Sequence, residues 1–276
     1  MHHAPVGRVL DSWAYDPAQR DIVLFGGDGG HGAPSTGPLY GKTWTWNGTT
    51  WTRQHPAASP SPRAGAAMAW DPATCQLLLF GGGTFPDSYH FFASTWTWNG
   101  TTWTRWHPAT SPSPRENPDM FYDAALHEII LFGGNAPTDS PHYANHYDNQ
   151  TWAWNGRTWT RLHPAASPSP RDSGSLVYDP AARTAIMYGG YNDTGRLSDT
   201  WSFNGRSWTR LHPASTPGSD SPVSQAAYDR ATRQLVLYGG DVGLGGPYSH
   251  DMWTWNGSTW PSWTRPPSPG PAATAR

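Results

Sequence analysis

One hairpin-forming segment constrains the fold of this chain more than any other feature. Residues 43–53 read Thr-Trp-Thr-Trp-Asn-Gly-Thr-Thr-Trp-Thr-Arg, so Asn-Gly separates two stretches of alternating β-forming residues. Asn-Gly is the strongest short-range hairpin signal, because both central residues of a type I′ turn need a positive φ. With a two-residue turn at Asn47-Gly48, we expect Trp46 to face Thr49 and Trp44 to face Trp51.

The same hairpin occurs five times along the chain. It returns at residues 95–105, 151–161 and 200–210 and from residue 252 onward, and its Asn-Gly pairs lie 52, 56, 49 and 52 residues apart. Self-similarity at a spacing near 50 residues is typical of repeat proteins, in which each unit is completed by its neighbours. We therefore expect one repeat domain rather than two unrelated domains.

Each repeat contains two more strand signals before its hairpin. In the first copy these are residues 13–16 and residues 22–27, and a Pro-Ser linker at residues 55–63 leads to the next copy. The prolines suit a linker because proline cannot donate to a β-ladder. In all five copies the first strand ends on an aromatic residue and Asp, and the second on an aromatic residue and Gly-Gly.

Length variation is confined to one edge of the repeat. The Asp stands nine residues before the second aromatic residue in every copy, whereas 15, 12, 16, 9 and 11 residues separate the glycine pair from the hairpin. In an antiparallel meander, the variable loops and the linkers lie at the same edge. Repeat proteins place their binding sites on the face that carries the insertions, so we expect the ligand there.

A repeat of this length with four strands, Gly-Gly after the second strand, an aromatic residue in the third and Trp in the fourth resembles the kelch repeat. The resemblance covers residues 8 to about 265 and implies an all-β fold, a five-bladed kelch-type β-propeller with four antiparallel strands per blade. We expect one domain over residues 1–265, followed by a disordered Pro-rich tail at 266–276. The expected blades span about residues 8–57, 63–109, 115–165, 171–214 and 221–265. Pro261-Ser262-Trp263 interrupts the last hairpin, so its outer strand departs from the pattern.

Composition excludes several classes of protein. A net charge of −2 gives no electrostatic case for nucleic acid or an anionic membrane, and no apolar run reaches the length of a membrane span. The single cysteine, Cys75, excludes an intrachain disulfide framework. One lysine beside many Arg, Ala and Pro residues indicates a bacterial origin. The sequence leaves the compartment open, with the mature part of a secreted protein favoured over a cytoplasmic one.

Arginine is the first candidate for ligand binding. Arginine stands seven residues before the first-strand aromatic in four repeats, at Arg8, Arg63, Arg115 and Arg171, with Ser221 in the fifth. The position is similar to that of pocket-lining arginines in the kelch adaptor that captures acidic peptides, which implies a broken arginine ring at the channel mouth. The planar guanidinium group binds carboxylates bidentately. Glu116 and Asp172 follow two of these arginines and are candidates to neutralise them. The alternative is that the arginines tie the blades together.

Histidine is the second candidate. Four histidines followed by Pro form a column at the end of each hairpin and are interpreted as architectural: His55, His107, His163 and His212. The loop histidines His90, His146 and His250, with Glu116 or Asp119 as carboxylate, suit one divalent metal, either iron, copper or zinc. Metal-holding relatives in the galactose-oxidase-like propeller superfamily favour this hypothesis, although the ligand motifs of those relatives are absent here.

The sequence thus supports two functional hypotheses of different class, beside a third in which the propeller is a structural domain of a larger extracellular protein without a pocket. The first is a recognition propeller that binds an anionic peptide, protein or glycan on its variable-loop face, through the four arginines, Glu116 and the loop tyrosines Tyr89 and Tyr143. The second is a metal-dependent enzyme, of oxidase or lyase type, with the histidine site at the channel mouth. No Gly-x-Ser-x-Gly nucleophile elbow or phosphate loop is present, and no cofactor is certain. We expect a monomer.

Overall fold

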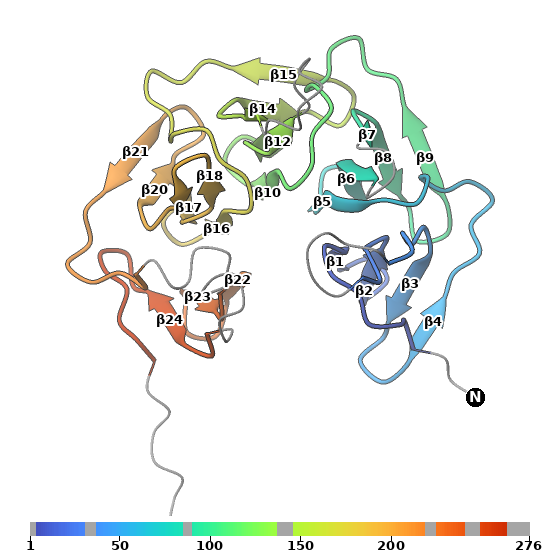
Figure 1. Cartoon of the computed structure of the whole chain (residues 1–276), viewed down its shortest axis with the longest axis horizontal. Helices are drawn as coiled ribbons and strands as arrows, with labels where there is room; N and C mark the ends of the chain where they lie inside the picture. Colours follow the sequence, from blue (N-terminus) through green and yellow to red (C-terminus); the bar gives the residue numbers. More distant parts are fainter. Residues whose placement is uncertain are drawn as a thin grey trace, which may run out of the picture.

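The computed structural model is a ring of five β-sheets, which are the blades of a propeller (Figure 1). It describes residues 4–30, 37–84, 90–136, 146–218, 225–240 and 249–263. The regular elements within these ranges are all strands, which confirms the predicted all-β class. The described ranges include no helix that is long and apolar enough to cross a membrane.

Each blade begins with its innermost strand and is antiparallel throughout. Blade 1 has β1 (Ser12–Asp16), β2 (Asp21–Phe25), β3 (Thr43–Trp46) and β4 (Trp51–Arg53). Blade 2 has β5 (Ala64–Asp71), β6 (Gln76–Thr84), β7 (His90–Phe91), β8 (Thr95–Trp98) and β9 (Trp103–Trp106). Blade 3 has β10 (Asp119–Asp123), β11 (Glu128–Phe132), β14 (Thr151–Trp154) and β15 (Trp159–Leu162), with the ribbon β12 (Asn135–Ala136) and β13 (His146–Tyr147). Blade 4 has β16 (Ser175–Asp179), β17 (Thr184–Tyr188), β20 (Thr200–Phe203) and β21 (Trp208–Leu211), with the ribbon β18 (Tyr191–Asn192) and β19 (Gly195–Arg196).

Blade 5 is the exception to the four-strand plan. Its sheet contains β22 (Gln225–Asp229), β23 (Gln234–Tyr238) and β24 (Met252–Trp255). Within the described ranges, the place of the outer strand is taken by an isolated bridge between Trp253 and Ser262. The departure follows from Pro261, which lacks the N–H that a regular ladder requires.

The predicted hairpin register is wrong. Trp46 pairs with Trp51, and Trp44 pairs with Arg53, so the loop contains four residues rather than two. The side-chain oxygen of Asn47 accepts hydrogen bonds from the main-chain N–H groups of Thr49 and Thr50, at 3.0 and 2.9 Å. Gly48 alone has the positive φ. The asparagine therefore acts through its side chain, which satisfies two turn N–H groups, and not through a left-handed backbone.

The turn between the first two strands has a constant length for a similar reason. The side chain of Asp16, at the end of β1, accepts hydrogen bonds from the N–H groups of Ala18 and Gln19. Arg20 then takes a positive φ before β2 begins. The same aspartate bond recurs in the other four blades, and each turn closes on one residue with positive φ.

Neighbouring blades are joined by a tryptophan that reaches back into the preceding blade. Trp103 of β9 packs its ring on Phe25 of blade 1, at 5.4 Å between centroids, and its indole N–H donates to the Thr43 hydroxyl at 2.9 Å. The contact recurs at the next three interfaces, with indole-to-threonine distances of 2.9, 3.0 and 3.2 Å. Four buried clusters fill these four interfaces. The tryptophans therefore stabilise the stack of blades.

The junction between blade 5 and blade 1 differs from the other four. The residue that corresponds to the acceptor threonine is Met252, which has no hydroxyl group. Tyr238, which corresponds to the aromatic packing partner, is 49% exposed, and Trp51 is only half-buried. Among the described residues, β22 does not pack on β1 as the other neighbouring inner strands pack on each other. Figure 1 shows the two blades on either side of the open part of the ring.

We predict that Trp159→Phe lowers the free energy of unfolding by about 1–3 kcal/mol, because it leaves the buried Thr95 hydroxyl without its indole donor. Urea unfolding measures the change. Trp51→Phe is the matched control, since the Trp51 indole donates to no other blade among the described residues, and it should cost less than half as much. Equal losses in the two variants would contradict a stabilising role for the interblade bond.

Candidate functional site

The face to examine is the one that carries the variable loops and the interblade linkers, which we call the loop-bearing face. β7, the ribbon β12–β13 and the ribbon β18–β19 all belong to loops between the second and third main strands of their blades. The predicted arginines lie in the linkers of this face, and the loop histidines lie in its variable loops. The outer strands also end at this face. The described part of this face therefore contains most of the candidate residues.

The predicted arginines tie adjacent blades together. Arg63, Arg115 and Arg171 are 2%, 0% and 0% exposed. The main-chain carbonyl of Arg63 accepts a hydrogen bond from Gly27 of blade 1, at 2.9 Å, while its guanidinium group donates to the Gly81 carbonyl of its own blade, also at 2.9 Å. Arg115 and Arg171 repeat both bonds one blade further on. Each arginine thus links two blades through its backbone and its side chain.

This close approach explains the glycine pair. Gly81 has a φ of +78°, and a Cβ atom at that position would lie 2.5 Å from the Arg115 carbonyl oxygen. Any larger residue would force the linker of the next blade away. The glycine pair that identifies the repeat is therefore required by the path of the arginine backbone across it.

The partners of the arginine charges differ between blades. Arg115 forms an ion pair with Asp148 at 3.0 Å, and Arg171 forms one with Asp199 at 2.6 Å. These aspartates, rather than Glu116 and Asp172, neutralise the two arginines, which corrects the prediction. The sequence analysis missed them because they stand four and two residues before their hairpin tryptophans. Arg63 has no carboxylate partner among the described residues; its guanidinium group lies 3.9 Å from the centre of the Phe92 ring.

The first arginine of the column is less enclosed. Arg8 is half-buried, donates to the carbonyl oxygens of Val6 and Gly26, and lies 4.3 Å from the centre of the Tyr40 ring. Burial lowers its pKa, while the nearby Asp11 raises it. Arg8 thus follows the structural pattern of the column at the edge of the ring.

A pocket of about 550 Å³ opens beside Arg63 on the loop-bearing face of blade 2. Its lining includes the linker residue Ser61, the aromatic residues Phe92 and Trp96, and the exposed side chains of Arg105 and His107. Burial, together with the like charge of Arg105, lowers the pKa of Arg63 to about 10. The pocket is therefore cationic and partly aromatic.

A second set of basic side chains, arginines and histidines, lies at the outer edge of the same face. The outer strand of each of the first four blades ends in an exposed arginine followed two residues later by an exposed histidine. We call this set the cationic rim: Arg53, His55, Arg105, His107, Arg161, His163, Arg210 and His212. The adjoining segments 52–63, 104–115 and 160–171 contain no aspartate or glutamate. The rim is thus a row of positive charge without acidic residues between its members.

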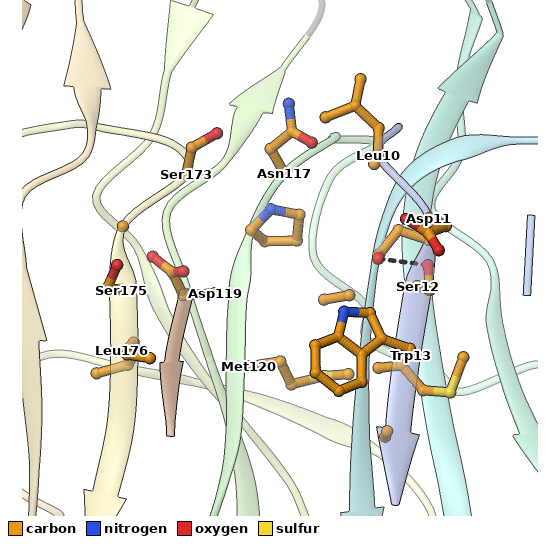
Figure 2. A pocket seen from close by; sticks show the side chains of 18 of the residues that line it. Leu10, Asp11, Ser12, Trp13, Asn117, Asp119, Met120, Ser173, Ser175 and Leu176 are labelled. Carbon is orange, nitrogen blue, oxygen red and sulfur yellow. Dashed lines mark hydrogen bonds between the residues drawn. The ribbon is translucent and has the colours of Figure 1, made fainter. Parts of the chain in front are cut away.

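The central channel has the opposite character. A cavity of about 520 Å³ is lined by the inner strands of the blades, with Asp11, Ser12, Asn117, Asp119 and Ser173 among its polar residues. Figure 2 shows Asp119 and Ser175 on one side of it and Asp11, Ser12 and Trp13 on the other. Carboxylates and hydroxyl groups therefore dominate the polar lining of the channel.

The carboxylates beside the channel hold their protons tightly. Burial raises the pKa of Glu116 to about 8, and the like charge of Asp172 contributes. Burial likewise raises the pKa of Asp172 to about 7, against the hydrogen bonds from Ser173 and Asn117. The pKa of Asp119 is also raised by burial and by Asp172. Glu116 accepts a hydrogen bond from Asn135 at 3.3 Å.

Comparison with known families agrees with this architecture. The model of the KLHDC2/KLHL20/DRC7 kelch-repeats domain matches residues 124–276, which is more than half of the chain. The chain belongs to the kelch-repeat family. Residues before 124 repeat the same Trp hairpin, glycine pair and arginine tie, so the kelch pattern continues through blades 1 and 2. Kelch domains generally mediate protein–protein interactions, and the fold is that of an interaction scaffold.

The kelch propeller does not gather the predicted metal ligands. His90, His146 and His250 are exposed on three different blades, and the His90 ring packs edge-on against Phe92 at 4.9 Å. No group of three His, Cys, Asp or Glu side chains in the described ranges is arranged to hold a metal ion. The metal-site hypothesis therefore lacks a ligand set there. The predicted binding residues Tyr89 and Tyr143 lie outside the described residues.

We predict that stability falls as the pH rises from about 5 to about 9, because Glu116 and Asp172 bind protons more tightly in the folded than in the unfolded chain. The raised pKa values place the loss between the normal carboxyl range and about pH 8. Glu116→Gln should flatten this dependence and exceed the wild type in stability at the alkaline end. Urea unfolding across the pH range measures it, with the exposed Asp193→Asn as control. An unchanged pH profile in Glu116→Gln would refute the assignment.

We predict that Arg171→Met lowers the free energy of unfolding by about 3–5 kcal/mol, because it removes the guanidinium bond to the Gly189 carbonyl and leaves the Asp199 carboxylate without its cation. Thermal and urea unfolding measure the loss. Arg161→Met, which removes an exposed arginine from the outer strand β15 of the preceding blade, should change stability by about 0.5 kcal/mol or less. If Arg171→Met is as stable as the wild type, the structural role of this arginine is wrong, and a role in ligand binding becomes the alternative.

Proposed function

We propose that this kelch propeller is a recognition module that binds an acidic peptide segment of a partner protein along the cationic rim. The observation that carries the proposal is the row of exposed arginine and histidine pairs on four consecutive blades, with no acidic residue in the three linkers between them. The chain as a whole has a net charge of −2, so this positive surface is a local feature. An extended acidic chain is able to contact several members of the rim at once.

The rim is a better place for an anion than the central channel. The channel lining includes Asp11 and Asp119, and Glu116 and Asp172 lie close by. The described lining of the channel contains no arginine, lysine or histidine, so a carboxylate there would have no cationic partner. The arginines of the rim are exposed and carry five N–H donors each, a geometry suited to carboxylates. An acidic glycan presents the same charge and is the alternative ligand.

Octaglutamate with a fluorescent label is the probe for this proposal, with octaglutamine as the uncharged control. We expect the wild type to bind octaglutamate, with an affinity that falls as the salt concentration rises. Arg161→Glu combined with Arg210→Glu should weaken binding about tenfold or more without changing the unfolding midpoint, because both residues are exposed. Fluorescence anisotropy measures the affinity.

The matched control reverses two exposed arginines at the opposite edge of the propeller. Arg20→Glu combined with Arg183→Glu makes the same change in net charge in the turns between the first and second strands. This variant should bind octaglutamate within about twofold of the wild type. Equal weakening in both double variants would show that net charge, and not the rim, determines binding. A heparin oligosaccharide in place of the peptide tests the glycan alternative.

A further inference from the structure

One carboxylate in blade 4 joins two donors that each of the first four repeats provides. Asp199 Oδ2 accepts a hydrogen bond from Arg171 Nη2 at 3.0 Å and another from the indole N–H of Trp201 at 2.7 Å. Its second oxygen, Oδ1, accepts from Arg171 Nη1 at 2.6 Å. The buried arginine and the first hairpin tryptophan are thus both satisfied by one acidic side chain.

Blade 3 satisfies the same two donors with two residues. Arg115 Nη2 donates to Asp148 Oδ2 at 3.0 Å, and the Trp152 indole donates to Gln150 Oε1 at 2.9 Å. In both blades the other Nη2 bond goes to the serine two residues before the arginine. The remaining N–H of Nη2 is therefore the donor that holds a carboxylate.

Blade 2 provides the same donors with a serine hydroxyl in place of the carboxylate, because Ser94 Oγ accepts from Arg63 Nη1 at 2.9 Å. Ser94 occupies the place of Asp199, since the N–H of the first glycine in the pair donates to its carbonyl in both blades, and Phe92 occupies the place of Asp148. Arg63 Nη2 donates to Ser61 Oγ at 2.9 Å. Its other N–H has no acceptor among the described residues, and the indole N–H of Trp96 is buried without a partner there.

These two donors line the cationic pocket of blade 2. Arg63 and Trp96 are both in its wall, and Phe92 stacks on the guanidinium group at 3.9 Å. The exposed Arg105 lies 6.0 Å from the centre of the Trp96 ring, and we expect this side chain to move when a ligand enters. Blade 1 also lacks the acid, but Lys42 stands there in the place of Ser94, and Asp11 already lies near Arg8.

We propose that the pocket of blade 2 binds one carboxylate of the peptide, from an aspartate or glutamate side chain, in the position that Asp199 fills in blade 4. One oxygen of this carboxylate accepts from Arg63 Nη2 and from the Trp96 indole, and Arg105 contacts it from the solvent side. The proposal rests on the proposed function, and makes blade 2 the point at which the acidic chain is anchored. The three remaining rim positions contact its other charges.

Ser94→Asp tests the proposal, because it supplies the missing carboxylate from the chain itself at the repeat position of Asp199. We expect this variant to have a higher melting temperature than the wild type and to bind octaglutamate at least about tenfold more weakly. Ser94→Ala is the control that adds no acceptor to the pocket, and it should not weaken octaglutamate binding by more than about twofold.

The indole N–H resonance of Trp96 reports the site directly. It is assigned in a ¹⁵N–¹H spectrum by its loss in Trp96→Phe. We expect octaglutamate to shift this resonance in the wild type and to leave it unmoved in Ser94→Asp. A general loss of charge at the rim would not produce this pattern.

The outcomes separate this proposal from the function on which it rests. Octaglutamate binding that depends on Arg161 and Arg210 but is unchanged in Ser94→Asp overturns the pocket and leaves the recognition function standing. Binding in the wild type that fails to shift the Trp96 resonance has the same meaning. Absence of octaglutamate binding to the wild type overturns both.

Discussion

The contact on which the structure depends is the indole that crosses from each blade into the one before it. A four-stranded sheet of this kind cannot bury both of its faces alone, so its stability comes from its neighbours. Trp103 shows how the joint works, because its ring covers Phe25 while its N–H satisfies the Thr43 hydroxyl at 2.9 Å. Arg63 adds a second joint at the loop-bearing face, through the Gly27 and Gly81 bonds. Together these joints hold the linkers and the pocket of blade 2 in place.

The architecture was predictable because the constraints repeat five times in the sequence. The constant nine-residue interval from Asp16 to Phe25 reflects a turn closed by the aspartate side chain, and the structure repeats it in each blade. The hairpin register was not predictable from Asn47-Gly48 alone, since both two-residue and four-residue loops accommodate that pair. Packing decides between them, because the observed register sets Trp98 opposite Trp103 within the interblade core.

The candidate site was predictable in its positions but not in its partners. The arginine column is visible in the sequence, and the alternative that it ties the blades together agrees with the bonds of Arg115 and Arg171. Their acidic partners stand in loops of unequal length, so Asp148 and Asp199 do not align in a column. The cationic rim is visible in the sequence as the repeated Arg-x-His-Pro motif. A repeated motif of this kind is equally expected for buried architectural residues, and the structure shows that these arginines are exposed. That Arg63 has no carboxylate partner among the described residues is seen only when the blades are superimposed on one another.

Among the described residues, the five blades share four complete interfaces, and this has a consequence for how the molecule opens. In a linear array, each unit is as stable as its own fold plus the contacts with its neighbours. Blades 1 and 5 have one such neighbour each, because Met252 and Tyr238 do not reproduce the joint with Trp51. Local unfolding should therefore start from the two ends of the arc and move inward. The pocket of blade 2 lies next to terminal blade 1, whose Gly27 N–H binds the Arg63 carbonyl, so fraying of blade 1 loosens this pocket whereas fraying of blade 5 leaves it in place.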